Sequence, residues 1–440
     1  MEGLGSTTVK DSNRPAKHAG QTVAWILSQL ALAAAVACGW SVSGSPQQSG
    51  DTGQNRADAG AGGEAPPDAQ PASEPGRPDR APIAVPLDAC TPLLYIAKVA
   101  IGSQTFELAV DTGSTTLGVA SSQCTDCKVS PLYAPGATAL DEMRTATSEY
   151  GTGSWTAEVY QDSVGFVSDP SVELKFAAIT TQKNFFEPVA CHSGRSYQGI
   201  IGLDRATSEL AGTTAFVDRF VAAKGIANVF ATELCDTGGT LWIGGYDTTV
   251  ATGAPQYVPI TTDVTSSYYY TVDLESVEVS GSTTPVAIAR ASTYPDTVVD
   301  TGTTAFVVPS AVFDELTSAI ARSPGFSQLF GVDAGASWFS GELPCGAAGT
   351  TKAQIDAALP SLTLTFGKDP GVAIRMAASD SYFVRFPGYG WCSLLAPVPA
   401  RTPFPLAAIL GSPFLRTQIT IFDRAGGRIG FAPHADCSGD

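Results

Sequence analysis

Residues 108–119 read LAVDTGSTTLGV, and residues 297–308 read TVVDTGTTAFVV. The two segments are identical at six of twelve aligned positions, and these include the Asp-Thr-Gly triplets that begin at Asp111 and Asp300. In both segments an apolar run leads into Asp-Thr-Gly and another apolar run follows, which predicts two strands joined by a tight turn that glycine permits. Each aspartate therefore lies on a short loop, and two such loops can face each other across a pseudo-twofold axis.

A second pair of similar segments indicates that the chain is duplicated. Residues 199–202 read GIIG and residues 408–411 read AILG, and the last glycine follows its aspartate by 91 residues in the first half and by 111 in the second. A single Asp-Thr-Gly would be weak evidence, because Asp and Gly are common in ordinary turns. Two copies in matched apolar segments, each followed by this second motif, predict two homologous halves.

Composition favours a mostly β protein and narrows the chemistry. The 440 residues include 25 Lys and Arg and 42 Asp and Glu, a formal charge of −17, so we expect no nucleic acid partner. The 45 glycines, the 30 prolines and the many Thr, Ser and Val suit strands and turns. With three histidines and no HExxH, Walker-type or GxSxG motif, the chain is expected to use carboxylates for catalysis, without a metal or another cofactor.

The order of the motifs resembles that of the pepsin-like aspartic endopeptidases, and the resemblance extends over residues 93–433. Besides the two Asp-Thr-Gly segments it rests on YGTGS at 150–154, GIIGL at 199–203, GTLWIGGY at 239–246, ILGSPFLR at 409–416 and IFDRAGGRIGFAP at 421–433. It implies a mostly β, bilobal fold, with two pseudo-twofold-related β lobes at 90–248 and 249–440 beside a central cleft. Short amphipathic helices are predicted at 213–224 and 310–322.

The resemblance implies an aspartic-type endopeptidase that hydrolyses extended polypeptides with a water molecule activated between Asp111 and Asp300. Two close carboxyl groups cannot both ionise, so the pair shares one proton and can supply both a base and an acid. The residues implied to support the pair are Thr112, Gly113, Ser114, Thr301, Gly302 and Thr303. Ordinary turn capping is the alternative role for such hydroxyl groups. The alternative function is a non-catalytic surface binding protein of the same fold, and a monomer is expected in either case.

A flap that closes over the substrate is implied at the hairpin tip formed by Tyr150, Gly151, Thr152 and Gly153. A surface hairpin with an exposed tyrosine is the alternative interpretation. One position departs from the family pattern, because Gly118 stands where many pepsin-like enzymes have a tryptophan that braces the flap tyrosine. Trp155 is a candidate substitute that could pack under the flap, or else a half-buried strand residue.

The first 89 residues are interpreted as a targeting segment, 1–38, and a disordered linker, 39–89. Residues 23–37 are mostly apolar after a polar, Lys- and Arg-containing start, which is typical of a secretory signal and short for a membrane span. Residues 35–38, AVAC, resemble a bacterial lipobox in which Cys38 is lipidated, and the alternative is cleavage after AVA. The protein is therefore expected to be exported, either as a lipoprotein of the cell surface or outer membrane, or in secreted form.

Activation and disulfide pairing can also be addressed from the sequence. The linker contains no lysine that could shield the two aspartates, so we expect the enzyme to be made in active form.

The nine cysteines leave an even eight once Cys38 is set aside. The resemblance implies the bridges Cys124–Cys127 and Cys345–Cys392, with a redox or zinc site as the alternative for the first pair. The sequence does not decide how the other four pair: Cys90, Cys191, Cys235 and Cys437.

Overall fold

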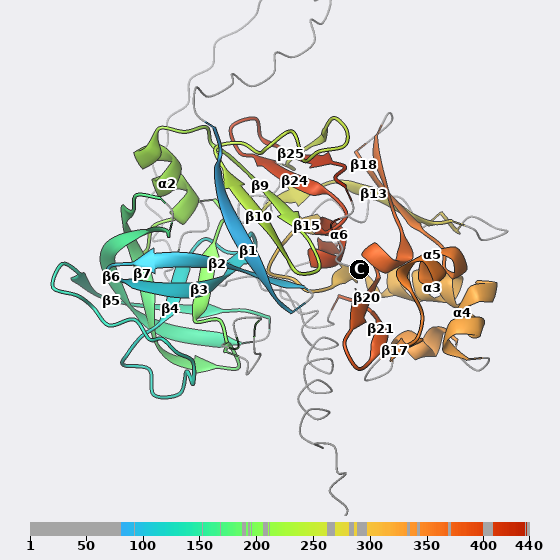
Figure 1. The fold of residues 1–440 in the computed structure, drawn as a ribbon, viewed down its shortest axis with the longest axis horizontal. Coiled ribbons are helices and arrows are strands. Elements are labelled where there is room, and N and C mark those ends of the chain that lie inside the picture. The colour runs from blue at the N-terminus through green and yellow to red at the C-terminus, as the bar shows by residue number, and fades with distance from the viewer. Residues whose placement is uncertain are drawn as a thin grey trace, which may run out of the picture.

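The computed structural model describes residues 81–91, 93–151, 153–167, 169–186, 191, 194, 196–205, 210, 212–261, 269–280, 286–287, 297–331, 335–340, 344–367, 371–398, 408–435 and 437. In this part of the chain the strands form four sheets, and the helices are short (Figure 1). The expected mostly β fold is confirmed.

The largest sheet has thirteen strands and contains most of the first half of the chain. Its strand order is β11-β25-β24-β9-β10-β1-β2-β3-β8-β4-β7-β6-β5. The strands are β1 (Ile83–Thr91), β2 (Leu94–Ile101), β3 (Gln104–Asp111), β4 (Leu117–Ala120), β5 (Leu140–Glu149), β6 (Ser154–Phe166), β7 (Val172–Lys183), β8 (Gly199–Gly202), β9 (Val229–Leu234), β10 (Gly238–Ile243), β11 (Gln256–Pro259), β24 (Ile419–Asp423) and β25 (Arg428–Ala432).

Three smaller sheets lie in the second half, with the orders β12-β15-β23-β16-β22, β14-β13-β18-β19 and β17-β21-β20. Their strands are β12 (Thr271–Val272), β13 (Leu274–Val279), β14 (Val286–Ala287), β15 (Thr297–Val299), β16 (Phe306–Val308), β17 (Cys345–Gly346), β18 (Leu362–Phe366), β19 (Val372–Met376), β20 (Phe383–Phe386), β21 (Gly390–Ser393), β22 (Leu395–Pro397) and β23 (Ala408–Leu410). The helices are α2 (Phe216–Lys224), α3 (Ser310–Ala321), α4 (Pro324–Phe330), α5 (Lys352–Ala358) and α6 (Ser412–Leu415), with 3₁₀ turns η3 (Ala336–Ser340) and η4 (Ala378–Asp380).

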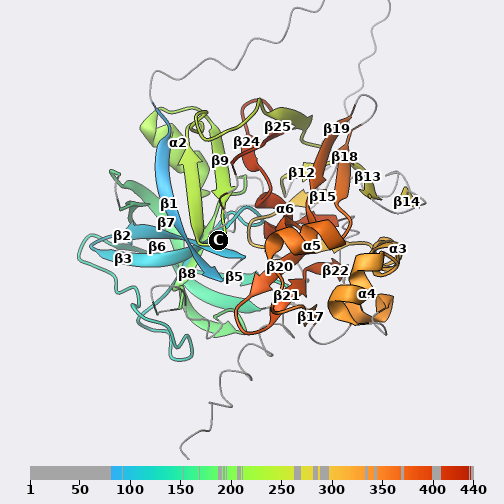
Figure 2. The ribbon, with the colours of Figure 1, turned by 45° about the vertical axis from the view of Figure 1, so that its right-hand side comes forward.

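The two lobes stand on either side of a central group of strands. Strands β2 to β7 with α2 form one side, and α3, α4 and α5 with β20 and β21 form the other (Figures 1 and 2). Strands β24 and β25 come from the second half, yet they extend the large sheet by pairing with β9 and β11. The halves are therefore joined through one continuous sheet rather than by a linker alone.

The duplication predicted from the two repeated motifs is present in the strand pairing. Strand β8 runs parallel to β3 and antiparallel to β4, and β23 runs parallel to β15 and antiparallel to β16. In this register Asp111 lies beside Gly202, and Val299, which precedes Asp300, lies beside Leu410. Each GIIG-like segment is thus inserted between the two strands that flank an Asp-Thr-Gly turn.

The start of the folded part differs from the expected linker. The prediction of disorder over 39–89 is wrong at its C-terminal end, because β1 begins at Ile83 and pairs with β10 and β2. The physical reason is an alternating pattern in which Val85, Leu87 and Ala89 are buried. Residues 1–80, which contain the proposed targeting segment and Cys38, lie outside the described residues.

The helices agree closely with the amphipathic patterns. Helix α3 spans almost all of 310–322 and buries Val312, Phe313, Leu316 and Ile320. Helix α2 begins three residues later than predicted and ends before Gly225, whose left-handed φ of 60° suits glycine. Within the described ranges no helix combines the length and apolar character needed to cross a membrane.

Four disulfides are formed, and they use all eight cysteines that follow Cys38. Cys124–Cys127 and Cys345–Cys392 are the pairs that the family resemblance implied. The structure adds Cys90–Cys191 and Cys235–Cys437, which close loops of 101 and 202 residues. This number of disulfides indicates that the protein folds outside a reducing cytosol.

Candidate active site

The two Asp-Thr-Gly turns meet at the centre of the molecule. Asp111 is the last residue of β3, Asp300 directly follows β15, and both side chains are buried, with exposed fractions of 1% and 0%. The strand residues that lead directly into the two aspartates are buried, because β3 and β15 each run between two neighbouring strands. The turns are thus fixed on rigid elements from both halves of the chain.

A reciprocal set of hydrogen bonds joins the two turns. The Thr112 hydroxyl donates to the Val299 carbonyl at 3.0 Å, and the Thr301 hydroxyl donates to the Val110 carbonyl at 2.9 Å. The Thr301 backbone N–H donates to Thr112 Oγ1 at 3.0 Å, and the Thr112 N–H donates to Thr301 Oγ1 at 3.1 Å. Each threonine therefore binds the strand that leads to the opposite aspartate.

The carboxyl groups are oriented by donors from their own turns. Gly113 N–H and the Ser114 hydroxyl donate to the two oxygens of Asp111. Gly302 N–H donates to Asp300 Oδ1 at 2.8 Å, and the Thr303 hydroxyl donates to Asp300 Oδ2 at 2.6 Å. The structure thus places all six predicted supporting residues, Thr112, Gly113, Ser114, Thr301, Gly302 and Thr303, in contact with the pair or its turns.

Both turn glycines are required by the close approach of the opposite carboxyl group. A Cβ atom at Gly113 would lie 2.8 Å from Asp300 Oδ1, and a Cβ atom at Gly302 would clash with Asp111 Oδ1. Neither contact could be relieved without moving a carboxyl group. The glycines therefore allow the two aspartates to come together.

Burial and mutual repulsion shift the titration of the pair. Burial raises the pKa of Asp111 well above its ordinary value, and the negative charge of Asp300 raises it further. Burial also raises the pKa of Asp300, against hydrogen bonds from Thr303, Asp111 and the N–H of Gly302. A pair in this state retains one shared proton at a pH where an isolated carboxyl group has lost its own.

The predicted flap is the turn between β5 and β6. The Tyr150 N–H donates to the Gly153 carbonyl at 2.6 Å, which closes the turn, and Thr152 lies outside the described residues. The alternative of an exposed surface hairpin is wrong for the tyrosine, because Tyr150 is 6% exposed. Burial raises the pKa of Tyr150, and the charge of Asp111 adds to that rise, which places the phenol near the dyad.

Gly118 faces the side chains of Ile179, Ile200 and Trp155, and the Ile179 Cδ1 is the nearest, 3.4 Å from the position of a Cβ atom. A Cβ atom at Gly118 would lie 3.6 Å from Cζ2 of Trp155, and the Trp155 and Tyr150 ring centroids are 6.4 Å apart. Trp155 is 2% exposed, so it is not half-buried. The Tyr150 hydroxyl and the Trp155 Nε1 are both buried.

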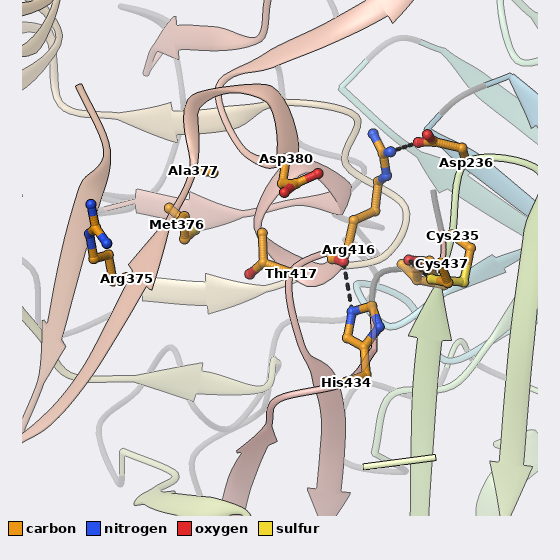
Figure 3. Close-up of a pocket in the computed structure, with 11 residues that line it drawn as sticks. Cys235, Asp236, Arg375, Met376, Ala377, Asp380, Arg416, Thr417, His434 and Cys437 are labelled. Atoms are coloured by element: carbon orange, nitrogen blue, oxygen red, sulfur yellow. Dashed lines mark hydrogen bonds and ion pairs between the residues drawn. A yellow bond between two sulfur atoms is a disulfide. The ribbon is translucent and has the colours of Figure 1, made fainter. Parts of the chain in front are cut away.

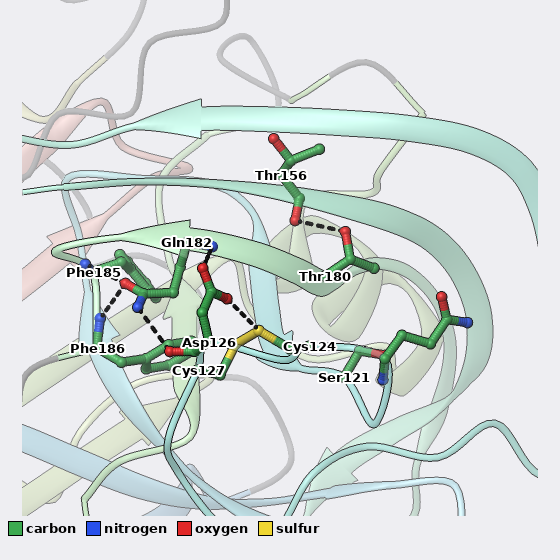
Figure 4. Close-up of a disulfide and its surroundings, with 10 residues drawn as sticks. Ser121, Cys124, Asp126, Cys127, Thr156, Thr180, Gln182, Phe185 and Phe186 are labelled. Atoms are coloured by element: carbon green, nitrogen blue, oxygen red, sulfur yellow. Dashed lines mark hydrogen bonds between the residues drawn. A yellow bond between two sulfur atoms is a disulfide. The ribbon is translucent and has the colours of Figure 1, made fainter.

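The Cys124–Cys127 disulfide is connected to the flap through one glutamine (Figure 4). The Gln182 Nε2 donates to the Asp126 carbonyl at 3.1 Å, and the Gln182 Oε1 accepts from the Phe185 N–H at 2.9 Å. The Phe185 ring lies 5.1 Å from the Tyr150 ring. The disulfide loop therefore supports the aromatic residues on which the flap tyrosine packs.

Two groups of potential metal ligands contain disulfide sulfurs. Cys124 and Cys127 lie with Asp126, and Cys235 and Cys437 lie with Glu233. Because each cysteine pair is oxidised, its sulfurs are not thiolate ligands. The structure thus supports the disulfide interpretation of residues 124–127 over the redox or zinc alternative.

A cavity of about 210 Å³ lies next to the Cys235–Cys437 disulfide (Figure 3). Its polar lining includes Asp236, Arg416 and His434, and Arg416 forms an ion pair with Asp236. Its lining contains neither aspartate of the pair and no flap residue. We therefore do not assign the peptide substrate to this cavity.

Two residues beside the pair were missed by the sequence analysis. The Asp204 N–H donates to the Ser114 carbonyl at 2.9 Å, and the Ser412 N–H donates to the Thr303 carbonyl at 2.8 Å. They follow Gly202 and Gly411, at which a Cβ atom would clash with the backbone of the two Asp-Thr-Gly loops. The signal that could have identified Asp204 and Ser412 is the second repeated motif, GIIG and AILG, which both residues follow. This motif indicated a duplication, but no role was expected for the residues after it.

Comparison with known proteins gives consistent matches. The sequence profile of the eukaryotic aspartyl protease family matches residues 94–434. An aspartic protease of Phaffia rhodozyma is 28% identical over 353 residues, covering 77% of this chain and 76% of that protein. Pepsin-2B of Gadus morhua is 28% identical over 355 residues, covering 78% and 96% of the two chains. Cathepsin E of Oryctolagus cuniculus is 27% identical over 354 residues, covering 77% and 80%.

Proposed function

The chain belongs to the family of eukaryotic aspartyl proteases and is an aspartic-type endopeptidase acting on polypeptides, and from this we propose that Asp111 and Asp300 are its catalytic pair. The observation that carries the proposal is the reciprocal bonding of the two turns, in which Thr112 and Thr301 each bind the opposite strand. Such bonding holds two buried carboxyl groups together although their charges repel.

The pair can hydrolyse a peptide bond without forming a covalent bond between enzyme and substrate. The ionised carboxylate accepts a proton from a water molecule, whose oxygen attacks the peptide carbonyl carbon, while the protonated carboxyl group donates to the carbonyl oxygen. Collapse of the tetrahedral intermediate breaks the C–N bond. The proton taken from the water passes to the departing amine, and a hydroxyl proton of the intermediate returns to the second carboxylate. The donors Gly113, Ser114, Gly302 and Thr303 keep the carboxyl groups oriented for these transfers.

The hairpin tip at Tyr150, Gly151, Thr152 and Gly153 is proposed to close over a substrate bound as an extended strand. Support comes from Tyr150, which packs between Trp155 and Phe185 on the side of the flap near Asp111. Closure would exclude bulk water and strengthen the electrostatic interactions in the site.

A direct test is cleavage of an unfolded protein substrate from strongly acidic to weakly alkaline pH. Asp111→Asn and Asp300→Asn should each lower kcat by at least about 10²- to 10⁴-fold, and a pepstatin-type inhibitor should block the parent. Asp314→Asn, an exposed change of the same charge on α3, is the control and should leave kcat unaltered. A well-folded parent that cleaves nothing at any pH would instead favour the non-catalytic binding protein.

We also propose that residues 1–38 direct export and that Cys38 carries a lipid anchor, with cleavage after AVA and secretion as the alternative. The disulfides support export in either form. Mass spectrometry of the membrane-extracted N-terminus distinguishes the two, because an unmodified terminus excludes the anchor. We expect a monomer, which light scattering measures.

The enzyme is proposed to be active as synthesised. Its basis is that residues 39–89 contain no lysine that could neutralise Asp111 and Asp300 before activation. The measurement is activity together with intact mass before and after acidification. A drop in mass at the N-terminus that accompanies the appearance of activity would contradict this proposal.

A further inference from the structure

Asp204 is a third buried carboxyl group next to the two aspartates. It lies two residues after the end of β8 and is 0% exposed. The turn that carries it is bonded to the first catalytic loop, because the Leu203 N–H donates to the Asp111 carbonyl at 2.8 Å and the Asp204 N–H donates to the Ser114 carbonyl at 2.9 Å. The backbone of Asp111 is therefore held in part by this turn.

Among the described residues, only one oxygen of the Asp204 side chain accepts a hydrogen bond. Its Oδ1 accepts from the Arg205 N–H at 2.7 Å, whereas its Oδ2 is buried and has no hydrogen-bond partner within the part of the chain that the structure describes. A carboxylate oxygen buried in this way carries a large desolvation cost, whereas a protonated carboxyl group avoids most of it. The site therefore favours the neutral acid.

The charged groups that face Asp204 come from several elements. Arg205 is on its own turn, Asp300 is on the second catalytic loop, and Arg424 is on the turn between β24 and β25. The Arg424 guanidinium is engaged elsewhere, since its Nη1 donates to Asn228 at 3.1 Å and its Nη2 pairs with Asp218 of α2 at 2.6 Å.

The phenol of Tyr270 also lies in this group, and its hydroxyl donates to the Leu203 carbonyl at 3.0 Å. Burial raises the pKa of Asp204 well above its ordinary value. The hydrogen bond from the Arg205 N–H and the positive charges of Arg205 and Arg424 oppose this rise, whereas the negative charge of Asp300 adds to it. The net rise in pKa and the burial of Oδ2 without a partner among the described residues both favour the protonated form of Asp204.

We propose that Asp204 is a positioning residue for Asp111, that it does so as a neutral acid, and that its ionisation toward neutral pH loosens the 202–205 turn and inactivates the enzyme. The inference rests on the proposed role of Asp111 and Asp300. On ionisation the proton leaves to solvent, and the remaining buried charge lies close to Asp300. When the turn opens, water hydrates that charge. The hydrogen bonds from the Leu203 and Asp204 N–H groups to the Asp111 and Ser114 carbonyls are then lost.

The test uses the full chain and the variants Asp204→Asn and Asp204→Ser, with Asp314→Asn as the charge-matched control. Each protein is incubated over a series of pH values, its Tm is recorded at each pH, and its remaining peptidase activity is measured after return to acid. Asp204→Asn keeps an acceptor for the Arg205 N–H without an ionisable group, so its inactivation midpoint should move upward by about one pH unit. Its Tm should also fall less steeply as pH rises, and the control should follow the parent.

Identical midpoints and Tm profiles for parent and Asp204→Asn would overturn the proposal. If neither Asp204 variant folds, the Asp111→Asn/Asp300→Asn double variant is melted over the same pH range. In that variant Tm should still fall toward neutral pH, and a flat profile would be a contrary result. Because Tm does not depend on catalysis, failure of the proposed dyad is seen separately, as retained cleavage by the Asp111→Asn or Asp300→Asn enzyme.

Discussion

The sequence around Thr112 and Thr301 says little about what these two residues do. Each is a small hydroxyl residue after an aspartate, and taken alone each would be read as a turn-capping residue. In the folded protein each is buried and donates to a carbonyl from the other half of the chain. Their hydroxyl groups therefore connect the two Asp-Thr-Gly turns.

Thr112→Val should lower both stability and kcat. The substitution keeps the shape but removes the donor to the Val299 carbonyl and the acceptor for the Thr301 N–H, which leaves two buried groups unsatisfied. The free energy of unfolding should fall by about 1–3 kcal/mol for each unsatisfied group. Thr112→Ser, which restores the hydroxyl, is the matched control in denaturant titration and kinetics. Equal stability of the Val and Ser variants would show that the interlock contributes nothing.

At the scale of elements, the hairpin that carries the proposed flap approaches β4 at Trp155 and Gly118. Strand β4 carries Gly118, and β6 carries Trp155, whose Cζ2 atom lies 3.6 Å from the position of a Cβ atom at that glycine. A larger side chain at 118 would therefore meet the indole together with Ile179 and Ile200. This arrangement makes the two positions interdependent.

Gly118→Trp alone should destabilise the N-terminal lobe, because Ile179, Ile200 and Trp155 already surround the site and extra volume in a packed core costs about 1–3 kcal/mol. Trp155→Ala should raise KM by removing the surface on which Tyr150 packs, with a smaller effect on kcat. The Gly118→Trp/Trp155→Ala double variant should recover part of both losses. A double-mutant cycle of Tm and KM measures this coupling, and strictly additive effects would argue against it.

At the scale of the whole molecule, the halves are joined by shared strands and by one long disulfide. Strands β24 and β25 complete the large sheet, and Cys235–Cys437 joins the chain after β9 to a residue beyond β25. Both connections link segments that are distant in sequence. Stability should therefore depend more on them than on the local Cys124–Cys127 loop.

Removal of the long disulfide should cost more stability than removal of the short one. In the chain-entropy account a loop of 202 residues corresponds to about 5 kcal/mol and a loop of 3 residues to about 2 kcal/mol. Denaturant unfolding of Cys235→Ser/Cys437→Ser and of Cys124→Ser/Cys127→Ser tests the order. The second variant should also raise KM, because the Asp126–Gln182–Phe185 contacts lead to the flap. The reverse order of stabilities would contradict the entropy argument.

The stability of the whole molecule should decrease as pH rises from acid toward neutral. Asp111, Asp300 and Asp204 have pKa values raised by burial, so their contribution to stability is fully present below the ordinary aspartate pKa and is lost as pH rises through the folded values. Each group contributes a slope of at most about 1.4 kcal/mol per pH unit. The formal charge of −17 acts in the same direction. Calorimetry across this pH range checks the sign, and a Tm that rises steadily toward neutral pH would refute it.

The sequence by itself determined the family, the β-rich class and the two Asp-Thr-Gly turns, because these depend on short motifs in apolar strands that repeat in order. It also located α3 and the flap hairpin, whose signals are local. Only the tertiary structure decided the pairing of Cys90 with Cys191 and of Cys235 with Cys437, the entry of β1 into the large sheet, the packing of Trp155 over Gly118 and the burial of Asp204. Those features depend on contacts between residues far apart in the chain, and local residue patterns do not specify which distant segments meet.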